Sequence, residues 1–132
     1  MNPRDRYEAV LAGDRADFLP RIPILMQFAA EYIGSNYGAF ASDHRVLVEA
    51  NLRCARDFGM EQLSTISDPY RETEGFGAEI RYHENAVPEC VHPPLADVAD
   101  VSSAKVPDPG ASVRMKDRLD AIRLYREKVG ET

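Results

Sequence analysis

The chain has 132 residues, 44% of them hydrophobic and 29% charged, with a formal net charge of −6. This composition is ordinary for a one-domain globular protein, and the acidic balance argues against nucleic acid and anionic membranes as partners, because both require a positively charged surface. No run approaches the ~18 apolar residues of a membrane span, and no apolar segment of a secretory signal follows Met1. Nothing in the sequence pairs the two cysteines, Cys54 and Cys90, so we expect a reduced, cytoplasmic protein.

The N-terminal part predicts a helix and then a buried strand. Asn2 and Pro3 are a capping residue and a first-turn proline, and Gly13 can end the helix that they begin. Residues 22–30 then form a nearly continuous apolar run. Such a run is typical of a parallel strand buried on both faces, although a helix remains possible where the run continues towards Tyr32.

Residues 43–68 predict a helix followed by a second strand. Asp43 is a capping residue, apolar side chains follow it at helical spacing, and Gly59 stands where a left-handed residue can end the helix. Residues 63–68 predict a short strand, which Pro69 ends. Strand, helix and strand with short connections form a βαβ unit, so we expect the two strands to be parallel.

The following segment alternates short elements with proline-rich breaks. Residues 73–77 predict a turn of helix, residues 78–82 a short strand and residues 84–94 a loop. A short helix is predicted around Val98.

A final helix begins after Ser112, which caps it, and Gly130 ends it. The basic residues of this helix, Arg114 among them, are expected on a solvated face where acids alternate with them. Its predicted apolar face consists of Met115, Leu119, Ile122, Tyr125 and Val129.

Two doubly buried strands and the helices that cover them do not close a core. A two-stranded sheet leaves two open edges, and edges with apolar faces need partners. We therefore expect further segments or a second copy of the chain to complete the sheet, so that a homo-oligomer is one expected state.

Three stretches, in the right order, resemble the uroporphyrinogen decarboxylase superfamily. Residues 23–32 resemble its first barrel strand, residues 56–68 and 74–80 its second strand with the segment that follows, and residues 95–109 the approach to a helix. The resemblance implies an α/β fold, namely a partial (β/α)₈ TIM barrel with an N-terminal helix, about two βα units and parallel strands. Residues 1–132 would form a single segment, the N-terminal third of such a barrel.

Asp68 is the strongest candidate for a catalytic residue. It ends the second predicted strand, so its carboxylate would point into the mouth of a barrel, where such folds bind substrates. The resemblance places it on the aspartate that binds the pyrrole N–H groups of a tetrapyrrole, where a carboxylate can stabilise a protonated pyrrole. The alternative is that Asp68 caps the turn at Pro69.

Tyr32, Tyr70 and Arg71 follow the predicted strands and are candidates for substrate binding. These two tyrosines and Tyr37 could line the pocket of a flat ligand, and packing under the first strand explains Tyr32 equally well. Arg71 lies on a loop that could face a substrate, and its alternative is a surface ion pair with Glu72.

Gln27 and Glu31 are further candidates for substrate binding, and they distinguish two activities. The decarboxylases resembled here carry arginines at these two places, and arginine binds substrate carboxylates through two hydrogen bonds as no amide can. A glutamate adds repulsion. These departures favour the corrinoid-dependent methyltransferases of the same superfamily, which pass a methyl group between a cobalamin protein and a thiol or similar acceptor. Decarboxylation of a porphyrinogen is the alternative activity.

The methyltransferase interpretation implies a corrinoid or tetrapyrrole ligand, or a corrinoid protein, as partner. In zinc-using relatives a His-x-Cys pair and a later Cys of the C-terminal part hold the metal, so we expect neither a metal nor a bound cofactor in this chain. The spacing of His83, Cys90 and His92 matches no usual zinc pattern. We expect the chain alone to be inactive, and a non-catalytic partial barrel that pairs with a partner chain is the third hypothesis.

Overall fold

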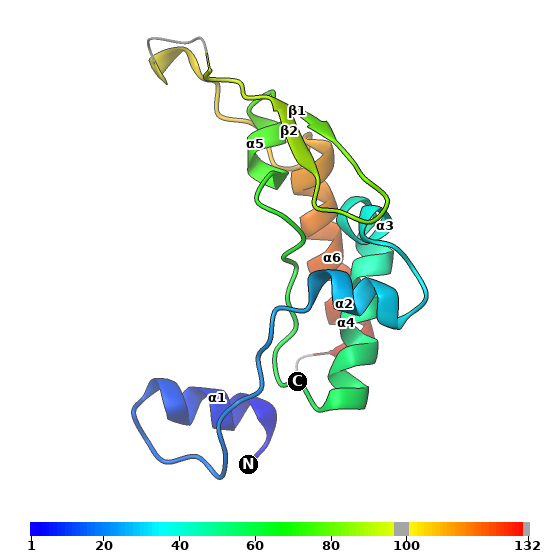
Figure 1. Ribbon diagram of the computed structural model, residues 1–132. Coiled ribbons are helices and arrows are strands. Elements are labelled where there is room, and N and C mark those ends of the chain that lie inside the picture. Colours follow the sequence, from blue (N-terminus) through cyan, green and yellow to red (C-terminus); the bar gives the residue numbers. More distant parts are fainter. Residues whose placement is uncertain (97–100, 131–132) are drawn as a thin grey trace.

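The computed structural model describes residues 1–96 and 101–130. Figure 1 shows an elongated molecule, with α1 at one end, a small hairpin towards the other and a group of helices between them. None of the helices in these ranges is long and apolar enough to cross a bilayer. The elements in chain order are α1 (Pro3–Leu11), α2 (Met26–Tyr32), α3 (Tyr37–Ser42), α4 (His44–Phe58), α5 (Arg71–Gly75), β1 (Glu79–Arg81), β2 (Glu89–His92), the 3₁₀ turn η1 (Val101–Ser103) and α6 (Val113–Val129).

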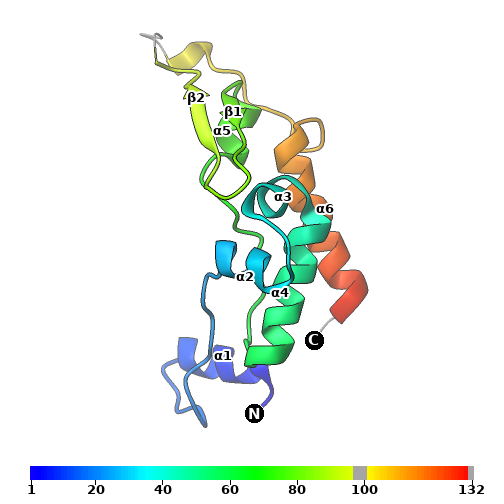
Figure 2. The same cartoon turned by 45° about the vertical axis from the view of Figure 1, so that its right-hand side comes forward.

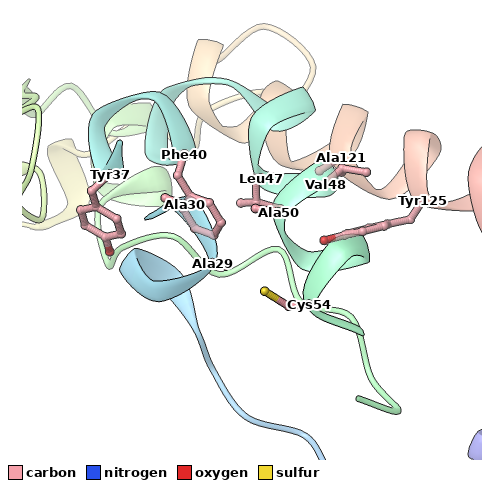
Figure 3. Close-up of a cluster of buried hydrophobic side chains, with 10 residues drawn as sticks. All are labelled: Ala29, Ala30, Tyr37, Phe40, Leu47, Val48, Ala50, Cys54, Ala121 and Tyr125. Carbon is pink, nitrogen blue, oxygen red and sulfur yellow. The ribbon is translucent and has the colours of Figure 1, made fainter. Parts of the chain in front are cut away.

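The core lies where α2, α3 and α6 pack against α4. The two longest helices, α4 and α6, lie side by side and run in the same direction, and the shorter α2 and α3 also contact α4 (Figures 1 and 2). Apolar side chains of α4 recur at helical spacing, so that they form one buried stripe. Figure 3 shows the ten buried side chains of this core: Ala29, Ala30, Tyr37, Phe40, Leu47, Val48, Ala50, Cys54, Ala121 and Tyr125.

The predicted caps of the three longer helices are confirmed. The side chains of Asn2, Asp43 and Ser112 each accept a hydrogen bond from a backbone N–H of the first turn of α1, α4 and α6. Gly59 ends α4 with a φ of 63°, in the left-handed region that glycine adopts without a steric penalty.

The strand predicted within residues 22–30 is wrong: residues 22–25 are not paired as a strand, and α2 begins at Met26. The alternative of a helix reaching Tyr32 is confirmed, and Ala29 and Ala30 of this helix are fully buried in the core. Met26 has a φ of 33°, which residues with a side chain rarely adopt, and it marks the abrupt change from extended chain to helix.

Residues 63–68 run as an extended segment but form no strand. They lie beside residues 20–25 in both views (Figures 1 and 2). Within the described ranges, the Glu61 N–H, just before the second stretch, donates to the Arg21 carbonyl oxygen at 2.9 Å, and no backbone hydrogen bond joins residues 63–68 to residues 20–25. A strand requires a ladder of such bonds to a neighbouring strand. The parallel strands predicted for a partial barrel are therefore not confirmed.

The sheet of this structure is the antiparallel pair β1 and β2, with Glu79 opposite His92. The strand predicted at residues 78–82 is confirmed, whereas the loop predicted at residues 84–94 is wrong where it contains β2. A hairpin brings its own partner strand, so it forms without any distant segment. The middle of the short helix predicted over Leu95, Val98 and Val101 lies outside the described residues, and Val101 begins the 3₁₀ turn η1.

The buried face of α6 differs from the predicted one. Ala121 and Tyr125 are buried against α4, but Leu119 and Ile122 are 36% and 48% exposed. Arg114, expected on a solvated face, is buried. Tyr125 thus confirms part of the predicted face, whereas Leu119 and Ile122 remain partly uncovered. The charge of Arg114 is balanced by Asp68.

Candidate functional site

Asp68 ends the extended segment 63–68, and its side chain has no exposed surface. The guanidinium of Arg114 donates to Asp68 Oδ1 at 2.9 Å and to Oδ2 at 2.6 Å. The Ser67 hydroxyl donates to Oδ2 at 2.6 Å, and the Tyr70 N–H donates to Oδ1 at 2.9 Å. Two-pronged contacts between arginine and carboxylate are among the strongest protein hydrogen bonds. Both oxygens of Asp68 are therefore engaged within the chain itself.

These contacts keep Asp68 charged although it is buried. Burial raises the pKa of the carboxyl group, because the charged form loses its hydration. The hydrogen bonds from Arg114, Ser67 and the Tyr70 N–H outweigh this effect and leave the pKa of Asp68 below its ordinary value. Burial likewise lowers the pKa of Arg114, but its bonds to Asp68 raise it above the ordinary value overall. The two residues form a buried ion pair.

The bond from the Tyr70 N–H confirms that Asp68 caps the turn at Pro69, as one interpretation of the sequence predicts. The side chain of Tyr70 is half-buried. The turn therefore presents Tyr70 next to a carboxylate that is already occupied, and a direct catalytic role for Asp68 remains a prediction.

Arg71 is a second fully buried cation. It donates from Nη1 to Asp117 Oδ2 at 2.7 Å and from Nε to the Ser67 hydroxyl at 3.0 Å. The predicted surface ion pair between Arg71 and Glu72 is wrong, because Glu72 binds an arginine of α6 instead. Since Ser67 bonds to both Arg71 and Asp68, the two ion pairs belong to one network.

Asp117 extends this network to the start of α4. Its Oδ1 accepts the His44 backbone N–H at 2.9 Å and lies 2.8 Å from His44 Nδ1. The Ala41 carbonyl oxygen at the end of α3 accepts from Arg114 at 3.2 Å and from Arg71 at 3.4 Å. The network thus joins α3, α4, α5 and α6. We refer to Asp68, Arg71, Arg114 and Asp117 together as the buried charge cluster.

Local structure in α6 explains how two members of this cluster are placed. Arg114 and Asp117 share one face of the helix because they are three residues apart. The Ser112 hydroxyl donates to Glu74 Oε2 at 3.0 Å, which ties the start of α6 to α5. The helix dipole disfavours a cation in the first turn, so Arg114 requires a nearby anion, and Asp68 provides it.

Two tyrosines contact the buried charge cluster or its neighbour Ser67. The Tyr37 hydroxyl donates to the Ser67 carbonyl oxygen, and burial, followed by a nearby negative charge, raises the pKa of Tyr37. The same hydroxyl lies 3.5 Å from the sulfur of Met26. The start of α2, where Met26 has its unusual positive φ, therefore lies next to Tyr37. The Cζ atom of Arg114 lies 5.2 Å from the centre of the Tyr82 ring, a cation–π contact.

The predicted substrate-binding residues of α2 are Gln27, Glu31 and Tyr32, and all three are exposed. Gln27 Nε2 donates to Glu31 Oε1 at 2.7 Å. The Tyr32 hydroxyl donates to Asp57 Oδ2 at 3.1 Å, and its ring centre lies 5.0 Å from that of Phe58. The structure therefore brings Tyr32 to the end of α4, whereas Tyr70 and Arg71 lie with Asp68.

Arg114, Asp117 and Tyr82 are residues of this site that the sequence did not reveal, whereas Tyr37 was already a candidate for the pocket of a flat ligand. One signal was available. The helix dipole disfavours a cation in the first turn of a helix, so an arginine there suggests a nearby negative charge. Its partner could not be identified, since Asp68 lies 46 residues earlier in the chain.

The histidines and cysteine of the hairpin region do not assemble a metal site. His83 Nε2 lies 3.3 Å from Glu89 Oε2. In the part of the chain that the structure describes, no three side chains of His, Cys, Asp or Glu come together as metal ligands.

A family model for uroporphyrinogen decarboxylase (URO-D) matches residues 2–132. The chain belongs to the uroporphyrinogen decarboxylase family. A solved methyltransferase from Methanosarcina mazei has a similar fold, with a TM-score of 0.82 and 22% sequence identity over 98% of this chain. The 132-residue chain spans only 40% of the length of that methyltransferase chain. A comparison with curated proteins gave no match. The superfamily resemblance seen in the sequence is thereby confirmed.

Proposed function

We propose that residues 1–132 form the N-terminal part of a methyltransferase of the uroporphyrinogen decarboxylase family that uses a methylcorrinoid. The observation that carries this proposal is the pair Gln27 and Glu31, which stands where the decarboxylases of the family carry arginines. The similar fold of the methyltransferase from Methanosarcina mazei agrees with the proposal at the level of the fold.

The exposed side of α2 offers no positive charge at these two positions. Gln27 and Glu31 lie one turn apart and bind each other at 2.7 Å, so the amide is already engaged. Uroporphyrinogen carries many carboxylates, and arginine is the side chain that binds such groups through two parallel bonds. Glu31 would repel them. Transfer of a methyl group carried by a corrinoid does not require positive charge at these two positions of α2.

In this proposal the chain contributes binding and orientation. A bound methylcorrinoid would supply the methyl group for a thiol acceptor. Tyr82 offers an aromatic ring beside the buried charge cluster, and Tyr70 follows Asp68 in the adjoining turn. No zinc ligand is assigned to the described residues, because they contain no suitable group of side chains. A corrinoid protein as partner and a cytoplasmic location belong to the same proposal.

The test compares two reactions of the full-length protein. Methylcobalamin and a thiol are supplied in one, and uroporphyrinogen in the other, with the visible spectrum and chromatography of porphyrins as the respective measurements. We expect methylcobalamin to be consumed and uroporphyrinogen to remain intact. Decarboxylation without methyl transfer would contradict the proposal.

A pair of substitutions tests the role of α2 directly. The double variant Gln27→Arg/Glu31→Arg restores both cations, and we expect it to bind uroporphyrin about tenfold more tightly than the wild type. The control Glu49→Arg makes one of these two changes, the charge reversal from glutamate to arginine, at an exposed position of α4. An equal gain in affinity for uroporphyrin in the double variant and in the control would show a general charge effect, and the positions on α2 would then have no special role.

A second candidate is a non-catalytic role in which the chain pairs with a second copy or a longer partner. Exposed apolar side chains on the two extended segments favour it, because Ile22, Ile24 and Ile66 are 47%, 61% and 43% exposed. Analytical ultracentrifugation of the 132-residue chain should show concentration-dependent association that Ile24→Lys weakens. A monomer at every concentration would exclude self-association.

A further inference from the structure

We propose that Arg114 and Asp117 of α6 are positioning residues, which hold the turn at residues 67–71 in one register through Asp68 and Arg71. The inference rests on the proposed function, since it assigns to this turn the task of presenting Tyr70 at the site. The inference is based on the four residues of the buried charge cluster together and not on a single ion pair.

The two halves of the cluster have complementary order. The turn carries Asp68 and then Arg71, whereas α6 carries Arg114 and then Asp117, each pair with the same spacing of three residues. Asp68 faces Arg114 at 2.6 Å, and Arg71 faces Asp117 at 2.7 Å. If α6 shifted along the turn by three residues, Asp68 would face Asp117 or Arg71 would face Arg114, so that like charges would come together. The arrangement therefore selects one register.

Burial makes this selection strict. The side chains of Asp68 and Arg71 are 0% and 1% exposed, that of Arg114 is 4% exposed and that of Asp117 is 15% exposed. Bringing charges out of water offsets most of what their pairing contributes, so buried ion pairs add little net stability. An unpaired buried charge is nevertheless very unfavourable. The cluster thus acts mainly on geometry, by excluding other positions of the turn.

Tyr70 is the residue that this geometry controls. It lies between Asp68 and Arg71, and its N–H donates to Asp68 Oδ1 at 2.9 Å. Both neighbours are held by α6, so the backbone position from which the Tyr70 side chain extends depends on residues more than forty positions later in the chain. A site that must orient a ligand requires such support, because small displacements cost much activity.

The experiment separates positioning from stability in the full-length protein. Arg114→Gln leaves Asp68 unpaired, whereas the double variant Asp68→Asn/Arg114→Gln removes both charges and should regain much of the wild-type stability. Arg114→Lys keeps the charge without the two-pronged contact. The control Arg123→Gln removes an exposed cation from the same helix. Thermal unfolding, amide exchange of residues 67, 68, 70 and 71 and methyl transfer from methylcobalamin are measured for each.

We expect the double variant to unfold near the wild-type temperature, yet to exchange the amides of residues 67, 68, 70 and 71 about tenfold faster than the control. Its kcat, and that of Arg114→Lys, which retains Asp68, should fall about 100-fold with the KM for the thiol little changed. Exchange equal to that of the control, or a kcat that recovers together with stability, would overturn the inference. Should the double variant not fold, Arg114→Lys is held to the same two criteria. A wild-type protein without methyl transfer would contradict the proposed function alone, and the exchange rates would still decide the inference.

Discussion

Arg114 binds both carboxylate oxygens of Asp68, although 46 residues separate them in the chain. This pair fastens the end of the second extended segment to the start of α6. It also places an ion pair where the sequence alone suggests a carboxylate free to meet a ligand. The consequences can be measured through pH and through the packing on either side of the pair.

Acid should weaken the link between Asp68 and Arg114. The pKa of Asp68 in the folded chain lies below its ordinary value of 3.8. The unfolded chain therefore binds a proton more readily, so the stability due to the pair is fully present above the ordinary value and is lost as pH falls through the lower, folded value. Urea unfolding from neutral pH downward should show the free energy of unfolding decreasing below about pH 4.

Other carboxylates with lowered pKa, such as Asp17 and Asp57, contribute to the same acid sensitivity. The difference between the wild type and Asp68→Asn/Arg114→Gln isolates the buried pair. The double variant should lose less stability over the same pH range, and identical profiles would show that Asp68 has no depressed pKa.

Truncation of Leu47 should be costly, because its side chain is fully buried in the contact between α4 and its neighbours. Leu47→Ala should lower the free energy of unfolding by about 2–5 kcal/mol, through the lost apolar burial and the cavity left behind. Leu11→Ala is the matched control, since Leu11 is 69% exposed, and should change stability by less than about 0.5 kcal/mol. Equal effects in urea titrations would disprove the assigned core.

Gly38 should not tolerate alanine, because α3 touches the connection between β1 and β2 there. A Cβ at residue 38 would lie 2.6 Å from the His83 carbonyl oxygen, and the Gly38 N–H donates to the Glu84 carbonyl oxygen at 2.9 Å. Gly38→Ala should destabilise the fold by about 1–3 kcal/mol. At Gly110 the same substitution meets only an Asp108 side-chain oxygen at 3.4 Å. A Gly110→Ala protein should unfold like the wild type, and so should Gly38→Ala if the contact is absent.

Part of the fold follows from local sequence alone. Asn2, Asp43 and Ser112 cap helices, and Gly59 ends one, because capping depends on a side chain or a backbone angle within one turn. The family was likewise identified from the order of short motifs, and the model match over residues 2–132 confirms it.

The site was only partly predictable. Tyr70 and Arg71 lie next to Asp68 as expected, because all three follow the same extended segment. Tyr32 belongs to a different surface, where it contacts Phe58. Sequence adjacency therefore placed the near neighbours of Asp68 correctly and failed for a residue on another element.

The sequence by itself determined the family, the long helices and their ends, since these depend on local patterns or on motif order. Tertiary structure decided whether residues 63–68 form a strand, because a strand needs backbone partners from distant segments. It also decided which face of α6 is buried and that Asp68 binds Arg114. A buried charge requires an opposite charge within contact distance, and only the folded chain brings residues 46 positions apart together.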